Sequence, residues 1–169
     1  RMKKMQFVKK NYIGILFSIF IFNSQVYAEN STNHLKTIFF GAGCFWSVEK
    51  KFQETFGVVS VESGYADGKN IEPSYKEIIK MENRFNPDNY AEVVKVTYNS
   101  NKTSLENLTK TFFEMHDPTQ ENRQGNDIGV QYRSIILTSS VEETLISNQV
   151  KEEYQNLLSK KGYGLIRSE

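Results

Sequence analysis

Short apolar segments alternate with polar turns along most of this chain, and the spacing of the apolar positions separates strands from helices. Alternating apolar positions are typical of a strand, whereas a spacing of three and four residues marks one face of a helix. Val94, Val96 and Tyr98 fall on one side of an alternating segment, which predicts a strand at residues 91–99. We expect further strands at residues 36–43, 57–68, 133–138 and 162–166.

Three segments have helical spacing, and two of them begin with a Ser or Thr followed three residues later by Glu, the pattern of a capping box. Residues 73–81 fit either a strand or a short helix. The expected helices are residues 45–56, residues 103–116 with Thr103 and Glu106 as the capping pair, and a helix capped by Ser140 and Glu143 that runs to about residue 161.

The strands alternate with helices but are short and only partly apolar, unlike the long apolar strands of a doubly wound parallel sheet. We therefore expect an α+β fold: a two-layer sandwich with a mixed, largely antiparallel sheet and flanking helices, an elaboration of the ferredoxin-like arrangement. Residues 117–132 form a polar loop that is long for a simple connection, and loops of this length are often functional.

The first 28 residues have the organisation of a secretory signal. Basic residues end at Lys10, an apolar stretch covers residues 12–22, and the small residue Ala28 closes the segment. The apolar stretch is about half of the ~20 residues that span a bilayer. We expect cleavage after Ala28 and export, in a bacterium to the periplasm; an uncleaved membrane anchor is the alternative. Residues 29–36 then form a linker to a domain at residues 37–169.

Charge excludes one class of partner. Of the 21 basic residues five fall in residues 1–28, where none of the 20 acidic residues lies, so the remainder has a net charge of −4. It also has no long basic run, which argues against nucleic acid as a partner.

Cys44 is the only cysteine in the sequence. It follows Gly41 and Gly43 and precedes a predicted helix, so it is expected at a helix N-terminus, where free N–H groups and the helix dipole favour a thiolate. A lone cysteine is more often a buried packing residue. The glycine turn and the neighbouring Phe45 and Trp46, which offer an apolar wall, favour a nucleophile instead.

The histidine residues allow two other hypotheses, a cysteine hydrolase and a zinc site. His116 and Asp117 would permit a cysteine hydrolase, provided that the imidazole reaches the thiol. A structural role for His116 at the end of its helix is favoured. One cysteine and two histidines do not make a plausible zinc site.

GAGCFWSVEKKF, at residues 41–52, resembles the signature of the type A peptide methionine-S-sulfoxide reductases. The segments at residues 57–68, 73–75 and 90–99 resemble later blocks of that family, and residues 116–136 match almost throughout. The resemblance covers the chain from about Thr37 onward.

The resemblance implies a role for seven residues. It makes Cys44 the nucleophile and Glu92 the general acid. The remaining residues are Phe45 and Trp46, which would line the pocket for the substrate's methyl group, Tyr75 and Tyr132, whose hydroxyls would hold the sulfoxide oxygen, and Asp127, which would assist in the polar site.

The implied chemistry is physically coherent. Oxide is a very poor leaving group, so thiolate attack on a sulfoxide sulfur requires protonation of the departing oxygen. Glu92 should therefore lie in a desolvated place that raises its pKa. The product would be methionine and a sulfenic acid on Cys44, which a second thiol must reduce.

The sequence departs from the family pattern in several places. Tyr90 replaces the usual histidine, and the stretch between Tyr75 and Glu92 is about five residues longer, which leaves Glu82 as an alternative acid. Ser47 stands where some members have a cysteine, and the family continues past the point where this sequence stops, so we interpret the chain as truncated at its C-terminus.

These features lead to the functional expectation. We expect a monomer that reduces free or protein-bound methionine sulfoxide, binds no cofactor and is recycled by an external thiol reductant such as thioredoxin. The alternative is a relative that binds the sulfoxide or forms mixed disulfides without turning over.

Overall fold

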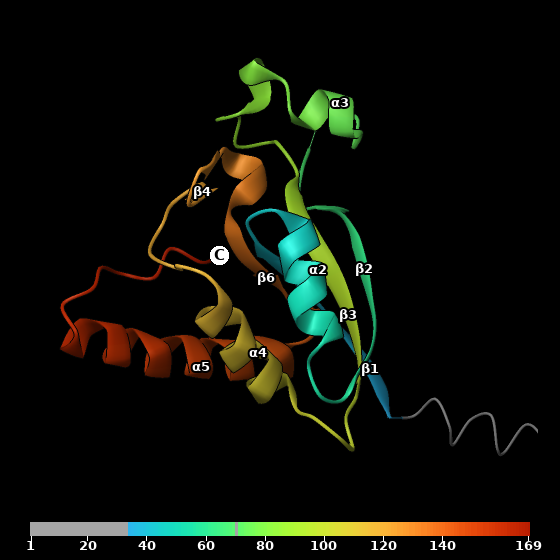
Figure 1. Cartoon of the computed structure of the whole chain (residues 1–169), viewed down its shortest axis with the longest axis vertical. Coiled ribbons are helices and arrows are strands. Elements are labelled where there is room, and N and C mark those ends of the chain that lie inside the picture. The colour runs from blue at the N-terminus through green and yellow to red at the C-terminus, as the bar shows by residue number, and fades with distance from the viewer. Residues whose placement is uncertain (1–33, 70) are drawn as a thin grey trace, which may run out of the picture. The chain divides into compact units, whose positions relative to one another are not determined.

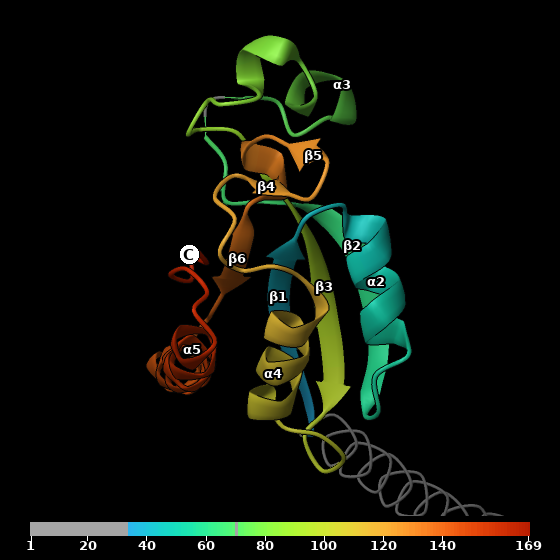
Figure 2. The same cartoon turned by 60° about the vertical axis from the view of Figure 1, so that its left-hand side comes forward.

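Four strands form one sheet in the order β2-β3-β1-β6. The computed structural model describes residues 34–69 and 71–169; the signal sequence expected at residues 1–28 lies outside them. The β1–β6 and β2–β3 pairs are antiparallel, and the arrows of β1 and β3 point in opposite directions in Figure 2. The strands are β1 (Leu35–Ala42), β2 (Val58–Ala66), β3 (Ala91–Asn99) and β6 (Ser134–Leu137). This arrangement confirms the predicted α+β fold.

Three helices supply the second layer and its flank. The helices α2 (Phe45–Gln53) and α4 (Leu105–Met115) connect strands of the sheet, and α5 (Val141–Lys160) packs beside α4 (Figures 1 and 2). The chain forms two strand–helix–strand units, β1-α2-β2 and β3-α4-β6, and the antiparallel β2–β3 pair joins them. This order is the ferredoxin-like pattern. No helix in residues 34–69 and 71–169 combines the length and the apolar character that a membrane span requires.

Two irregular connections lie beside the sheet. The β2–β3 connection, residues 67–90, contains α3 (Tyr75–Ile78) and the 3-10 helix η1 (Met81–Asn83). The predicted functional loop contains β4 (Arg123–Gln124), β5 (Asp127–Ile128) and η2 (Val130–Tyr132). Both connections gather at the same end of the sheet in Figure 2.

Stacked aromatic rings hold the helices on the sheet. The ring of Phe40, on β1, lies 4.9 Å from that of Phe52 on α2 and 5.1 Å from that of Phe112 on α4. All three side chains are fully buried. Burial of each phenylalanine contributes about 1.5–3 kcal/mol, so this cluster fixes α2 over β1.

Two local predictions are corrected by the structure. Ser104, rather than Thr103, caps α4 by accepting a hydrogen bond from the Asn107 amide at 3.2 Å, because Thr103 is buried against Gly57. Residues 162–166 do not form a strand. The Ser140 cap of α5 is confirmed.

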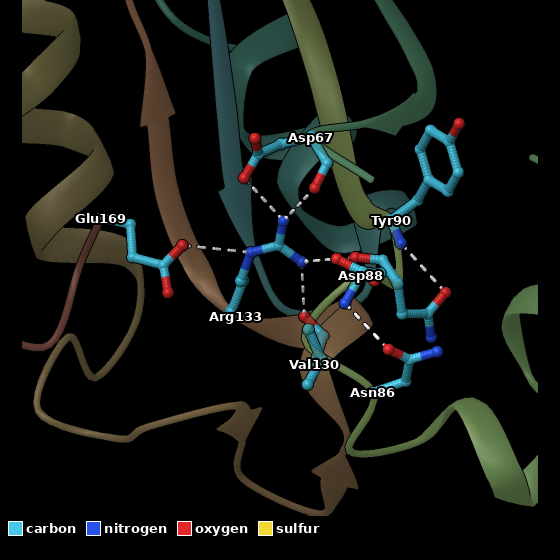
Figure 3. Close-up of polar contacts among 8 residues, drawn as sticks. Asp67, Asn86, Asp88, Tyr90, Val130, Arg133 and Glu169 are labelled. Atoms are coloured by element: carbon cyan, nitrogen blue, oxygen red, sulfur yellow. Dashed lines mark hydrogen bonds and ion pairs between the residues drawn. The ribbon is translucent and has the colours of Figure 1, made fainter. Parts of the chain in front are cut away.

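A buried arginine ties the β2–β3 connection to the rest of the domain (Figure 3). The guanidinium of Arg133 donates to the carbonyls of Asn89 and Val130, each at 3.1 Å, and to the carbonyl and carboxylate of Asp67 at 2.7 and 2.8 Å. Its Nε also lies 3.3 Å from a carboxylate oxygen of Glu169. A planar group with five donors can join three segments in this way.

We predict that Arg133→Met lowers the free energy of unfolding by about 3 kcal/mol, because it leaves the buried Asn89 carbonyl without this donor and removes the side-chain contacts with Asp67 and Val130. Urea unfolding measures the loss. Lys95→Met, which removes an exposed ion pair with Glu62, is the matched control and should change stability by less than about 0.5 kcal/mol. Equal losses in the two variants would contradict the role assigned to Arg133.

Candidate active site

Cys44 lies in the turn that joins β1 to α2. Gly43 has a φ of +92°, and a Cβ atom there would meet Gln124 at 2.7 Å, so the tight turn requires glycine. Cys44 is the N-cap residue of α2, and its side chain makes no capping hydrogen bond. The predicted position of the half-buried thiol at the positive end of a helix is therefore confirmed.

The carboxyl group of Glu92 lies directly beside this helix start. Glu92 is only 3% exposed, and its Oε2 accepts a hydrogen bond from the Phe45 amide at 3.0 Å. Gly41 makes the approach of β1 to β3 possible, since a Cβ there would meet the Glu92 carbonyl at 2.8 Å. The acid and the thiol are thus held by neighbouring elements.

Burial raises the pKa of Glu92, and the charge of Asp127 raises it further, while the Phe45 amide lowers it in part. The net shift is upward, which favours the neutral acid. This agrees with the raised pKa expected from the sequence. Glu82, the alternative acid, is exposed in η1.

Tyrosine hydroxyls lie near the carboxyl group and the thiol. The pKa of Tyr132, in η2, is raised by burial and by the charges of Glu92, Asp127 and Cys44. Burial raises the pKa of Tyr65 to about 12, helped by the charges of Glu92, Tyr75, Tyr132 and Cys44. Both phenols therefore stay protonated at neutral pH and can donate hydrogen bonds.

The other predicted residues lie around this centre. Asp127 is exposed in the short β4–β5 hairpin, where it pairs with Gln124. Tyr75 begins α3 and is 62% exposed, which places it at the rim. The rings of Phe45 and Trp46 stack at 6.4 Å, with Trp46 76% exposed, and so form an apolar surface next to Cys44.

His116 has a structural role. One ring nitrogen lies 2.7 Å from the Phe112 carbonyl and the other 2.7 Å from the Ser134 hydroxyl. Burial lowers the pKa of His116 to about 4, so the ring is neutral, donates to the carbonyl and accepts from the hydroxyl. Both nitrogens are occupied, which removes the basis for a cysteine hydrolase.

Sequence reasoning missed Tyr65 and Arg133. Tyr65 sits in a strand without a signal that separates it from a packing residue, and only its pairing with β3 places it near Glu92. Tyr90, the substitute for the family's histidine, packs its ring against Gly68. Among residues 34–69 and 71–169 no cluster of three or more metal-ligating side chains occurs.

A cysteine at a helix N-terminus, a buried carboxyl group with a raised pKa and protonated phenols define a thiol-based site on a ferredoxin-like α+β fold. The family model described as peptide methionine sulfoxide reductase matches residues 36–163. The chain belongs to this family.

Individual relatives are similar over most of the chain. The mitochondrial peptide methionine sulfoxide reductase of Rattus norvegicus is 45% identical over 130 residues, which cover 77% of this chain and 54% of the relative. Peptide methionine sulfoxide reductase MsrA of Rhodospirillum centenum is 42% identical over 135 residues, covering 80% and 59%. The chain therefore spans little more than half the length of these relatives.

Solved structures show the same fold. Methionine sulfoxide reductase A of Corynebacterium diphtheriae superposes with a TM-score of 0.72 at 37% identity, over 81% of this chain and 64% of that one. Mxr1 from Saccharomyces cerevisiae in reduced form gives a TM-score of 0.67 at 32% identity, over 80% and 74%. Mxr1 has also been solved in complex with Trx2.

We predict that Glu92→Gln stabilises the protein increasingly as pH rises. Because the folded-state pKa of Glu92 lies above its unfolded value of about 4.3, the wild type loses stability as pH rises from that value through the folded-state pKa. Glutamine keeps the acceptor for the Phe45 amide but does not ionise.

Urea unfolding of both proteins across this pH range measures the difference. Glu62→Gln, which removes an exposed carboxylate paired with Lys95, is the control and should show no gain in relative stability as pH rises. A difference between Glu92→Gln and wild type that does not vary with pH would mean that folding does not raise the pKa of Glu92.

Proposed function

We propose that this protein reduces methionine-S-sulfoxide, free or in proteins, to methionine and so repairs oxidative damage, as a peptide-methionine (S)-S-oxide reductase. The observation that carries the proposal is the pairing of Cys44, at the start of α2, with the buried Glu92 carboxyl group 3.0 Å from the next amide. The Glu92 carboxyl group accepts a hydrogen bond from the peptide N–H that joins Cys44 to Phe45, so the proposed acid lies beside the proposed nucleophile.

Each residue has a role in this proposal. The Cys44 thiolate attacks the sulfoxide sulfur and forms a sulfur–sulfur bond, and Glu92 protonates the oxygen as its bond to that sulfur breaks. The hydroxyl group then bonds to the Cys44 sulfur as the sulfur–sulfur bond breaks and methionine leaves. Tyr75 and Tyr132 donate hydrogen bonds to the oxygen, and Asp127 helps to hold Glu92 in its neutral form. The surface of Phe45 and Trp46 accepts the methyl group.

The reaction transfers one oxygen atom between two sulfurs. The sulfoxide sulfur gains two electrons and leaves as the sulfide of methionine, while the Cys44 sulfur loses two electrons and becomes a sulfenic acid. A thiol of the reductant then forms a mixed disulfide with Cys44 and releases water. A second thiol cleaves that disulfide and restores Cys44.

We propose a thioredoxin-like protein as the reductant. Within these 169 residues Cys44 has no second cysteine with which to form a disulfide. A reductant with two thiols can complete both steps, and the structure of Mxr1 with Trx2 shows that one relative binds such a partner. We further propose that the protein acts as a monomer and binds no nucleic acid.

We predict that the wild type reduces the S epimer of free methionine sulfoxide and leaves the R epimer unchanged, because an apolar methyl surface and fixed oxygen donors accept one configuration at sulfur. Cys44→Ser should abolish the reaction, since serine is a far weaker nucleophile at neutral pH. Chiral chromatography after incubation with dithiothreitol measures both results. Equal reduction of the two epimers would contradict the proposed function.

A single-turnover experiment separates catalysis from binding. Without reductant, the wild type should release one methionine per protein, and mass spectrometry should find a sulfenic acid on Cys44. Glu92→Gln should release methionine much more slowly while Cys44 still reacts with iodoacetamide. A sulfoxide that stays bound and unchanged would indicate a binding protein.

We propose that residues 1–28 direct export, in a bacterium to the periplasm, with cleavage after Ala28. The support is the order of basic, apolar and small residues in that segment. The prediction is that expression in a bacterium yields protein in the periplasmic fraction whose N-terminus, by Edman sequencing, is Glu29. An intact N-terminus in the membrane fraction would instead identify an anchor.

A further inference from the structure

Tyr65 lies across the β2–β3 pair from Glu92. The two residues are Cα partners in the antiparallel register, so their side chains project from the same face of the sheet. That face is the one α2 covers, because Ser63, two residues earlier on β2, donates a hydrogen bond to Glu49 of α2. Side chains of directly opposed residues start about 5 Å apart at Cβ, so the phenol and the carboxyl group are neighbours.

The ring of Tyr65 also contacts the apolar side of the site. Its centroid lies 5.6 Å from that of Phe45, at an interplanar angle of 44°. Tyr65 is half-buried, so the ring is held by packing while the hydroxyl retains access to the site. Phe45 is the residue whose amide donates to Glu92, which places Tyr65 beside both the methyl surface and the acid.

Electrostatics agree with this placement. The pKa of Tyr65 is raised not only by burial but also by the charges of Glu92, Tyr75, Tyr132 and Cys44. These are the proposed acid, the two proposed oxygen donors and the nucleophile. A phenol whose pKa responds to all four of these groups lies close to them. Because that pKa is raised, the hydroxyl stays a hydrogen-bond donor at neutral pH.

On the basis of the proposed function, we propose that Tyr65 is a further catalytic residue, whose hydroxyl donates a hydrogen bond to the sulfoxide oxygen beside Glu92. Its ring contacts that of Phe45. Tyr65 adds to Tyr75 and Tyr132 and does not replace them. Charge builds on the oxygen as the sulfur–oxygen bond breaks, so a donor fixed on a strand stabilises the transition state more than the bound substrate.

Tyr65→Phe tests the hydroxyl while it keeps the ring on Phe45. We expect the single-turnover rate with free methionine-S-sulfoxide to fall roughly tenfold to a hundredfold, the range for loss of one hydrogen bond to a developing charge. The rate at which iodoacetamide alkylates Cys44 should not change, because that reaction displaces iodide and breaks no sulfur–oxygen bond.

Tyr154→Phe is the matched control. Tyr154 is a half-buried tyrosine stacked on Phe113 at 5.5 Å, its pKa is also raised by burial, and it lies on α5. The substitution should leave the single-turnover rate and the alkylation rate as in wild type. Its melting temperature measures how much stability is lost when a stacked tyrosine loses its hydroxyl group.

The outcomes are distinct. Tyr65→Phe with wild-type turnover overturns this inference and leaves the proposed function standing. A parallel fall in turnover, alkylation and melting temperature assigns Tyr65 a packing role and also overturns it. A wild type that reduces neither epimer overturns the proposed function, and this inference with it.

Discussion

The hydrogen bond between the Glu92 carboxyl group and the Phe45 amide is the interaction on which the site depends. It joins β3 to the first turn of α2, and the absence of a side chain at Gly41 lets β1 lie close to β3 at this point. Glu92 is buried there, and burial raises its pKa by more than the Phe45 amide lowers it. One arrangement therefore places a buried carboxyl group with a raised pKa next to the Cys44 thiol.

The sheet order explains why distant segments meet there. In an antiparallel sheet of order β2-β3-β1-β6, the ends of β1 and β2 lie beside the beginnings of β3 and β6. Cys44, Tyr65, Glu92 and Tyr132 each lie at one of these four ends. Arg133 then fixes both irregular connections at that end by binding the backbone of Asp67, Asn89 and Val130 (Figure 3). The polar connections complete the site, whereas the Phe40 cluster stabilises the scaffold beneath it.

Most of the fold could be predicted from the sequence, because strands such as residues 91–99 have an apolar pattern that survives in the tertiary structure. The predictions of local structure were wrong where a tertiary contact outweighed the preference of the local sequence. Thr103 has the sequence of a cap but is buried against Gly57, so Ser104 takes the cap. Residues 162–166 contain apolar residues typical of a strand, but they pair with no strand of the sheet.

The sequence by itself determined the candidate nucleophile, since Cys44 is the single cysteine in these 169 residues and its glycine turn and following helix are local features. It also marked Glu92, Tyr132 and Asp127 through their resemblance to family motifs. Only the tertiary structure decided that Glu92 is buried and that Tyr65 faces it, and that Arg133 binds the two connections. Burial and strand register are properties of contacts between segments far apart in the chain, and a local pattern carries no information about which partner a side chain will meet.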